Sequence, residues 1–321
     1  MLLNSPLPIS TGFTGFNDNV GSLRNQGLEV SLRGTILDKR DFRWDATLMG
    51  SFNRNKVLSL TGGQDVITSG IRVIEVGRPI YTFYLPKTAG VDPATGKQLY
   101  YAYWTQTVND EGALVNTRCD EYITDNVAMA TLSKYYHESR EPKLFGSIGS
   151  TFTILKNIDV SFLTTYSIGG WVYDGLYNGS MYVQYAGNNW HKNAKRRWQK
   201  PGDNTKLARL SANDADGGNK NYSRISDISV QKGDYLCLRD VTLSYSFPKR
   251  WIGKLGLGNL TVSVSGNTLV YWTKVKGVSP ESAVAAAGSS TGMYSVVNTS
   301  SADYSIYPPT RKVMFSLKAT F

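Results

Sequence analysis

The sequence predicts an all-β fold in which about nine long strands form part of a transmembrane antiparallel β-barrel. Three observations support this prediction: segments of alternating polarity, strand lengths that match a lipid bilayer, and connections that alternate between short and long. The chain also contains 20 Tyr, 7 Trp and 31 Gly. This composition is typical of a β protein that needs many turns and that places aromatic rings at a water boundary.

The alternation is clearest in FRWDATLMGSFN (42–53), where every second residue from Phe42 to Phe52 is apolar or glycine and most of the others are polar. Successive side chains of a strand point to opposite faces, so the pattern predicts one apolar and one polar face. In YLCLRDVTLSYSF (235–247) the alternation is imperfect, because Arg239 falls on the face of Val241 and Leu243. Alternating segments occupy residues 24–36, 42–55, 76–88, 98–107, 143–155, 158–168, 235–247, 259–272 and 311–321.

The lengths of these segments favour a membrane barrel over a soluble sandwich. They run for about 10–14 residues, whereas a strand of a globular protein has roughly 5–6 and a tilted strand that crosses a bilayer about 9–11. The connections follow the same logic, since outer-membrane barrels have short periplasmic turns and long extracellular loops. If 311–321 runs toward the periplasm, every short connection is predicted there and every long one outside. The short connections are 37–41, 92–97, 156–157 and 248–258, and the long ones are 56–75, 108–142, 169–234 and 273–310.

Charge and composition exclude several other classes. Lys and Arg exceed Asp and Glu by ten (35 against 25), but they are scattered apart from KNAKRR (192–197), so we expect no nucleic-acid partner. No apolar run is long enough for a transmembrane helix. Residues 1–10 lack a basic region followed by an apolar stretch, so we expect no signal peptide. Nine strands is an odd number, whereas single-chain bacterial barrels have an even one, so we expect a portion of a larger protein.

The segment 233–282 resembles the penultimate hairpin of SusC/RagA-type TonB-dependent outer-membrane transporters. That family typically reads YLRLRNVTLSY-x-P, then a strand that ends in gqNL-aromatic-twT, then kGxdPE. Cys237 stands in place of the usual Arg, and Ser279 in place of the usual Asp. The matching residues are Tyr235, Leu236, Leu238, Arg239, Val241, Leu243, Tyr245, Pro248, Gly266, Asn267, Leu269, Trp272, Thr273, Gly277, Pro280 and Glu281.

Further segments resemble the family in the expected order, so the resemblance covers nearly the whole chain. They are NVGSLRNQGLEVSLRG (19–34), FRWDATLMGSFNRNKVLSL (42–60), VGRPIYTFY (76–84), WQKPGD (198–203) and YPPTRKVMFSLKATF (307–321). The resemblance implies that residues 1–321 are the C-terminal part of a barrel that has 22 strands in the family. It implies that the plug, the TonB box and the signal peptide lie outside this chain.

The same resemblance implies a function and partners. It implies TonB-dependent import of a nutrient, a glycan (oligosaccharide) or a peptide, together with a SusD-like surface lipoprotein that closes the barrel. The TonB complex would act through the N-terminal part, and outer-membrane lipids would surround the wall. The final strand would be the signal that the barrel-assembly machinery recognises. Its apolar face contains Phe315, Leu317, Ala319 and Phe321, with Val313.

The long loop 169–234 holds the candidates for contact with a substrate or with the lipoprotein. Flat rings with amides beside them can stack on a sugar or grip a peptide. For any single ring, an interfacial aromatic belt or packing within the loop is the more common role. The candidates are Trp171, Tyr173, Tyr177, Tyr182, Tyr185, Asn188, Asn189, Trp190 and Trp198.

No catalytic, metal or cofactor site is expected. His137 and His191 have no recognisable triad around them, and YYHESREP (135–142) is interpreted as solvated charge on a loop. NDADGGNK (213–220) lacks the distal Glu of a calcium loop and is interpreted as a polar turn. Cys119 and Cys237 are the only cysteines, and the sequence leaves open whether they pair.

Two alternatives to an importer remain at this stage. One is an extracellular β-rich protein, a glycan-binding module or adhesin, with a closed soluble core. The other is a truncated barrel that does not function. An importer requires that Trp44, Phe52, Phe315 and Phe321 face lipid, and a soluble protein requires that they be buried.

Overall fold

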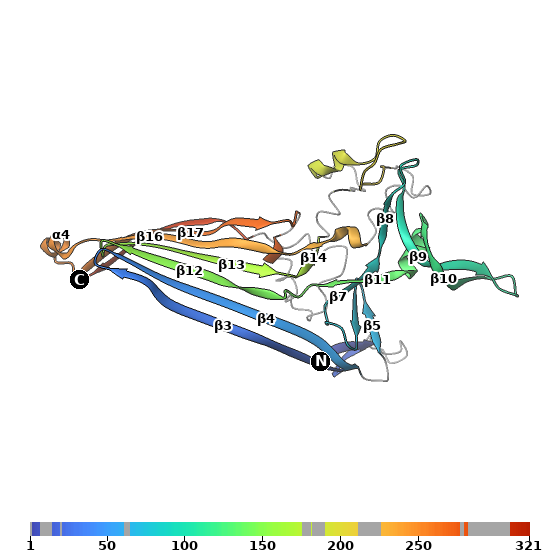
Figure 1. Ribbon diagram of the computed structural model, residues 1–321, viewed down its shortest axis with the longest axis horizontal. Helices are drawn as coiled ribbons and strands as arrows, with labels where there is room; N and C mark the ends of the chain where they lie inside the picture. The colour runs from blue at the N-terminus through green and yellow to red at the C-terminus, as the bar shows by residue number, and fades with distance from the viewer. Residues whose placement is uncertain are drawn as a thin grey trace.

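The computed structural model describes residues 2–6, 15–19, 21–60, 65–174, 181, 190–210, 226–276, 279–281 and 309–321. Its largest unit, which we call the wall, is a seven-stranded antiparallel sheet in the order β18-β17-β16-β13-β12-β4-β3. The strands run side by side along the length of the molecule, and their two ends differ sharply (Figure 1). The strands are β3 (Gly21–Lys39), β4 (Phe42–Leu60), β12 (Leu144–Ile154), β13 (Ile158–Ile168), β16 (Tyr235–Ser246), β17 (Asn259–Thr273) and β18 (Lys312–Thr320).

The register of the wall places mostly apolar side chains on one face and mostly polar side chains on the other. Residues that pair across neighbouring strands lie on the same face of a sheet. One row across the whole wall is entirely apolar: Leu37, Trp44, Phe152, Val160, Leu243, Val264 and Phe315. The next row is polar throughout: Asp38, Arg43, Thr153, Asp159, Ser244, Ser263 and Ser316. The wall therefore has one face suited to lipid and one suited to water.

A β-bulge explains the imperfect alternation of 235–247. Leu163 pairs with Asp240 and Thr164 pairs with Leu238, so Arg239 is the extra residue of β16. The bulge puts Leu238 and Val241 on the same, apolar face, and it corrects the prediction that they lie on opposite faces. A prediction that assumes strict alternation assigns every second residue to the same face, so it cannot anticipate an inserted residue.

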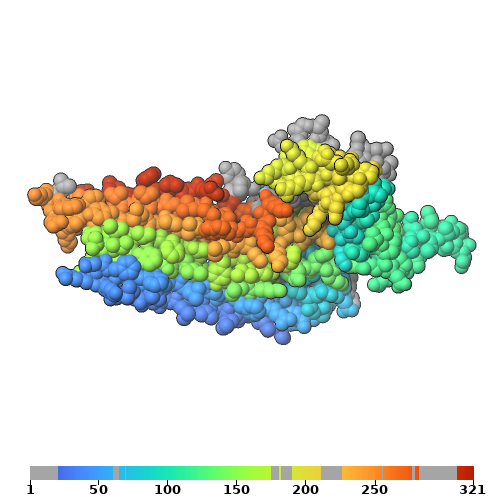
Figure 2. Space-filling model, turned by 45° about the horizontal axis from the view of Figure 1, so that its top comes forward, coloured from blue at the N-terminus to red at the C-terminus, as the bar shows by residue number. Residues whose placement is uncertain are grey.

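Four smaller sheets complete the strands of the described residues. The outer sheets, as we call the first two, have the orders β11-β7-β6-β5 and β10-β9-β8, and the others pair β14 with β15 and β1 with β2. Figures 1 and 2 show the outer sheets beyond one end of the wall, with β9 and β10 projecting furthest. Their strands are β5 (Val66–Ser69), β6 (Arg72–Glu75), β7 (Thr82–Pro86), β8 (Thr88–Val91), β9 (Gln98–Val108), β10 (Leu114–Thr124) and β11 (Lys134–Ser139). The pairs are β14 (Trp171–Tyr173) with β15 (Val230–Lys232), and β1 (Leu2–Pro6) with β2 (Gly15–Asn19).

The helical elements of the described residues are few and short. They are α1 (Val127–Leu132), η3 (Lys192–Arg196), η5 (Asp227–Ser229), α4 (Lys249–Ile252) and η6 (Gly253–Leu255). Asn126 caps α1, because its side chain accepts from the backbone N–H groups of Ala128 and Met129. Within the described part of the chain, no helix is long and apolar enough to cross a membrane.

Seven of the nine predicted strands form the wall, and the other two do not. Residues 76–88 contribute β7 and residues 98–107 contribute β9, both in the outer sheets. The turn 92–97 therefore lies among the outer sheets and not at the short-turn end of the wall (Figure 1). The two strands belong to half-buried hairpins. Such strands alternate between apolar and polar residues as membrane strands do, so the pattern alone does not distinguish the two. The prediction that every short connection lies on the periplasmic side is therefore wrong for 92–97. The other three short connections, 37–41, 156–157 and 248–258, do join neighbouring strands at one end of the wall.

The clusters of buried apolar residues lie mainly among the outer sheets and the loops beyond the wall. One cluster joins β4 to the outer sheets through Val57, Ile74 and Ile80. A second contains Ile71, Phe83 and Leu85, and a third Met181, Ala194 and Ala208. The two cysteines are unbonded, Cys119 in β10 and the buried Cys237 in β16, so the question left open by the sequence is settled against a disulfide.

Candidate substrate-contact site

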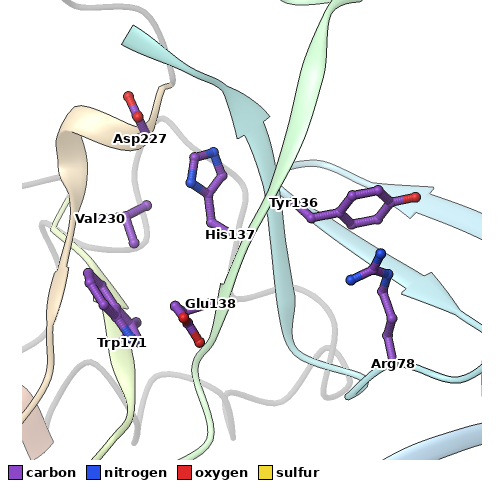
Figure 3. A pocket seen from close by; sticks show the side chains of 7 residues that line it. All are labelled: Arg78, Tyr136, His137, Glu138, Trp171, Asp227 and Val230. Atoms are coloured by element: carbon purple, nitrogen blue, oxygen red, sulfur yellow. The ribbon is translucent and has the colours of Figure 1, made fainter.

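A cavity of about 650 Å³ lies between the outer sheets and the β14–β15 pair. It is lined by Arg78, Tyr136, His137, Glu138, Trp171, Asp227 and Val230 (Figure 3). These residues come from four separate stretches of the chain, which the outer sheets bring together. The volume falls within the usual range of a small-molecule site, roughly 300–1,000 Å³.

Trp171 is fixed in the cavity wall by strand pairing. It lies opposite Lys232, whose ammonium is 5.9 Å from the indole ring. It also packs, with Tyr173 and Val230, against the buried cluster of Ile71, Phe83 and Leu85. Strand and core thus hold one indole ring at the cavity with little freedom to reorient, which suits a stacking surface.

Asp227 ties one side of the cavity to the outer sheets. Its Oδ1 accepts from the backbone N–H of Thr88 at 2.9 Å and from the Thr88 hydroxyl at 2.7 Å. Thr88 begins β8, so this link joins residues that are 139 positions apart in the sequence. The Asp227 carboxylate is therefore positioned at the cavity by two hydrogen bonds.

His137 and Glu138 follow one another on β11, so they project to opposite sides of the strand. The Nε2 atom of His137 lies 3.3 Å from the carbonyl oxygen of Leu85. A carbonyl can only accept, so this hydrogen bond requires a proton on Nε2. Glu138 is exposed. The sequence interpretation placed this stretch on a loop, which is wrong, because Lys134–Ser139 is a strand.

Arg78 and Tyr136 form the remaining side of the cavity. The guanidinium lies 3.7 Å from the centroid of the Tyr136 ring, and its Nε donates to Glu75 at 2.6 Å. Burial, together with the Glu75 carboxylate, raises the pKa of Tyr136. Tyr136 therefore stays a neutral hydrogen-bond donor and acceptor, and Figure 3 shows Arg78 beside its ring.

Pairs of tyrosine rings, and cations lying over tyrosine rings, continue from the cavity across the outer sheets. Tyr84 lies 5.0 Å from Tyr136, and Tyr103 lies 5.3 Å from Tyr135. Lys87 lies over both Tyr101 and Tyr135, at 4.3 and 5.3 Å. Each such contact contributes about 0.5–1 kcal/mol at an exposed site. Together they give the outer sheets a stiff aromatic surface.

The structure places four of the nine loop candidates and separates them into two groups. Trp171 lines the cavity and Tyr173 packs behind it. Trp190 lies elsewhere, next to η3, where Arg197 is 5.8 Å from its ring. Trp198 donates from Nε1 to the carbonyl of Pro93 at 2.9 Å, so it fastens the η3 segment to the β8–β9 turn. Tyr177, Tyr182, Tyr185, Asn188 and Asn189 lie outside the described residues, as does 213–220.

The other lining residues were not among the candidates. The sequence contained one weak signal for them, the two β-favouring tyrosines of KYYHES (134–139), within a segment that was predicted to be a loop. The approach of Arg78 and Asp227 to β11 has no sequence signal. Among the described residues, no group of three or more His, Cys, Asp and Glu side chains is placed to hold a metal ion.

Comparison with known proteins shows which proteins this chain is similar to. No family model matches the chain. The chain is 27% identical to TonB-dependent receptor P26 of Formosa agariphila, a match that covers 100% of this chain and 31% of the receptor. It is also 27% identical to TonB-dependent receptor SusC of Bacteroides thetaiotaomicron, over 87% of this chain and 26% of that protein. The chain thus spans about three-tenths of the length of the curated relatives it matches.

Solved structures agree at the level of the fold. The RagAB peptide transporter matches with a TM-score of 0.69 and 24% identity, over 88% of this chain and 29% of that one. The RagAB peptide importer in its closed-closed state matches with a TM-score of 0.67 and 25% identity. The chain therefore has the fold of a segment of a TonB-dependent receptor barrel. The resemblance to the C-terminal part of SusC/RagA-type receptors that the sequence predicted is confirmed.

Proposed function

We propose that this chain supplies strands and outer loops of an outer-membrane importer that takes up a glycan (oligosaccharide) or a peptide. In this proposal the wall spans the outer membrane, a SusD-like lipoprotein covers the outer sheets, and the TonB complex drives transport through the rest of the protein. The supporting observation is the pair of uninterrupted rows in the wall, one apolar and one polar across seven strands. A soluble sandwich would bury its apolar face, whereas Phe315 is 81% exposed and Leu243 52%.

The cavity at Trp171 is the proposed point of contact with the cargo. An indole ring, two carboxylates and an imidazole lie around it, and these groups suit a ligand rich in hydroxyl or amide donors. Both cargo classes, glycan and peptide, meet this description. The RagAB structures are of a peptide importer. Peptide is the cargo of that neighbour, and it does not identify the cargo of this chain.

Uptake by the native protein in outer membranes tests the proposal. We expect Trp171→Ala to lower uptake of the cognate cargo, labelled oligosaccharide or labelled peptide, roughly tenfold, as loss of an aromatic anchor does. Trp190→Ala, an equally large change at a ring outside the cavity, serves as the matched control. Equal loss from both variants would reject the cavity as the contact site, and normal uptake in a strain that lacks the protein would reject import itself.

We further propose that the apolar face of β18, with Phe315, Leu317, Ala319 and Phe321, is read by the barrel-assembly machinery. Phe315, Leu317 and Phe321 are 81%, 70% and 94% exposed, so the face is open for such a contact. Phe321→Ser should lower the amount of heat-modifiable barrel in outer membranes without changing its synthesis. Thr320→Ser is the control, and an unchanged barrel in Phe321→Ser would reject this role.

A further inference from the structure

The short-turn end of the wall is a single continuous edge, which we call the rim. It consists of residues 38–41, turn 155–157 and the connection 247–258 that contains α4. The N–H of Leu155 donates to the carbonyl of Asp41 at 2.8 Å, and that of Ser246 to the carbonyl of Asn157 at 2.8 Å. The N–H of Gly258 donates to the carbonyl of Thr320 at 2.7 Å. Figure 1 shows these turns gathered at the end where the C-terminus lies.

An aromatic belt runs along the apolar face beside the rim. The rings of Phe42 and Phe162 lie 6.1 and 6.0 Å from that of Phe152, which lies between them. On the neighbouring strands, Tyr245 lies 4.9 Å from Phe247, which lies 6.4 Å from Trp251 of α4. Rings of this kind mark the level of the lipid headgroups at the edge of a barrel's apolar band. The rim is therefore placed where headgroups would meet it.

The rim also carries an excess of positive charge. Lys39, Arg40, Lys156, Lys249, Arg250 and Lys254 are all exposed. Against these six cations stand the two carboxylates of Asp38 and Asp41, which leaves a net charge of 6 − 2 = +4. Among the ion pairs recorded for the described part of the chain, none involves any of the six cations.

Two of the cations are directed toward the apolar side of the rim. Lys39 pairs with Phe42 in the sheet register, so it lies on the apolar face beside the belt. The guanidinium of Arg250 lies 5.6 Å from the ring of Trp251, which is 52% exposed. Long cationic side chains at such positions place the stem along apolar surface and the charge among headgroups.

We propose that the rim is a binding surface for anionic phospholipid headgroups, with phosphatidylglycerol and cardiolipin as the chemical class. Lys39, Arg250 and Lys254 contact the lipid phosphate, and Trp251 lies at the level of the glycerol. A zwitterionic lipid carries its own cation and gains little from a surface of net charge +4, whereas an anionic lipid gains from each Lys or Arg near it. The inference rests on the membrane placement in the proposed function and specifies which lipid meets this end.

Lipid retention by the native barrel tests the inference. The protein is extracted from outer membranes in mild detergent, incubated with equal amounts of phosphatidylglycerol and phosphatidylethanolamine, and repurified, and the retained lipids are quantified by mass spectrometry. We expect the wild type to retain phosphatidylglycerol preferentially. The triple variant Lys39→Gln, Arg250→Gln, Lys254→Gln should lower this preference at least roughly fivefold. About 1 M salt, where the screening length is about 3 Å, should lower it as well.

The matched control is Lys192→Gln, Lys195→Gln, Lys200→Gln, which removes three exposed cations near η3 at the other end of the molecule. It should leave the preference unchanged. Equal retention of both lipids by the wild type would overturn the inference, as would an equal loss in the control. A third experiment offers lipopolysaccharide in place of phosphatidylethanolamine, to distinguish the lipid of the outer leaflet from that of the inner one. A preference for lipopolysaccharide over phosphatidylglycerol would overturn the assignment of the rim to phospholipid headgroups.

The result is distinguishable from a failure of the proposed function. Absence of a heat-modifiable band in outer membranes would reject the membrane placement on which both rest. Normal uptake by a barrel without any lipid preference would reject the rim as a lipid site and leave import intact.

Discussion

The wall and the outer sheets use the same antiparallel pairing in two different surroundings. In the proposed membrane placement each face of the wall meets one medium over its whole breadth, and whole rows can follow that medium, as the apolar row from Leu37 to Phe315 does. Ser150 and Thr164 are polar exceptions on the apolar face. Each residue of the outer sheets meets its own neighbours, in small clusters such as Val57, Ile74 and Ile80. The polarity of a side chain is therefore set by its face in the wall, and by its own neighbours in the outer sheets.

The largest expected effect comes from a charge placed in an apolar row. Ile148 lies in the middle of β12, pairs with Leu48 and Thr164, and is 43% exposed. Ile148→Arg should destabilise the barrel in lipid vesicles by about 2–4 kcal/mol, the cost of a cation facing lipid near the midplane. Denaturant titration of the heat-modifiable form measures this cost. Ser147→Arg, one residue away on the polar face, is the matched control, and equal costs would mean that the two faces do not differ.

The next effect concerns the polar face at the Arg239 bulge. The Arg239 guanidinium donates to Thr165 Oγ1 at 3.2 Å and pairs with Glu281, whose other oxygen accepts from the Tyr271 hydroxyl at 2.7 Å. Glu281→Ala should cost about 1–3 kcal/mol, because it leaves a partly buried cation without its carboxylate. A double-mutant cycle with Arg239→Met checks it by denaturant titration.

If the two residues act as a pair, the double variant costs less than the sum of the single ones. Glu111→Ala, in the exposed β9–β10 turn, is the control for loss of a carboxylate. Strict additivity of Glu281→Ala and Arg239→Met would contradict the pairing.

A third, smaller effect sharpens the contrast within the outer sheets. Gly96 and Gly112 both have a left-handed backbone, with φ of +73° and +79°. A Cβ at Gly96 would lie 2.5 Å from ring atoms of Trp198, whereas at Gly112 it would meet nothing within 4 Å. Both Gly→Ala variants should be destabilised by about 1–2 kcal/mol, because alanine is strained in the left-handed conformation.

Only Gly96→Ala should be destabilised further, because its Cβ displaces the Trp198 ring. Limited proteolysis of the 190–210 segment, followed with Trp fluorescence, measures the difference. Equal protease sensitivity of the two variants would show that Trp198 does not fasten this segment to the β8–β9 turn.

The contrast between the two regions also explains what the sequence could predict. The wall strands were predicted to within a few residues, β13 at Ile158–Ile168 among them, because a uniform medium imposes a period-2 pattern. The bulge at Arg239 was visible only as an irregularity. In the outer sheets β5, β6, β10 and β11 were missed, since strands held by individual contacts need no regular alternation.

The candidate site was predictable in part, for the same reason. Trp171 stood out as a ring in a long loop, and the structure places it at the cavity. Arg78, His137 and Asp227 reach that cavity from stretches far apart in sequence, through contacts such as Asp227 with Thr88. Such a meeting depends on tertiary structure, and no local pattern encodes it.

The smallest effect is expected at Glu141, which lies where the chain leaves β11 of the outer sheets for β12 of the wall. Burial raises the pKa of its carboxyl above the ordinary value of 4.5. The folded state therefore binds this proton more tightly than the unfolded state, so folding is favoured below pH 4.5 and loses that advantage as the pH rises through the folded-state pKa.

Glu141→Gln removes the charged form altogether. It should raise the thermal midpoint slightly at neutral pH and leave it unchanged in acid, where the carboxyl is protonated in both states. Thermal unfolding between acid and neutral pH measures the difference, with Glu111→Gln as the control for removal of a carboxylate in an exposed turn. A midpoint lowered at neutral pH would mean that the Glu141 carboxylate is stabilised at the junction of the two regions. The junction would then be held by charge and not by the apolar packing that the outer sheets use elsewhere.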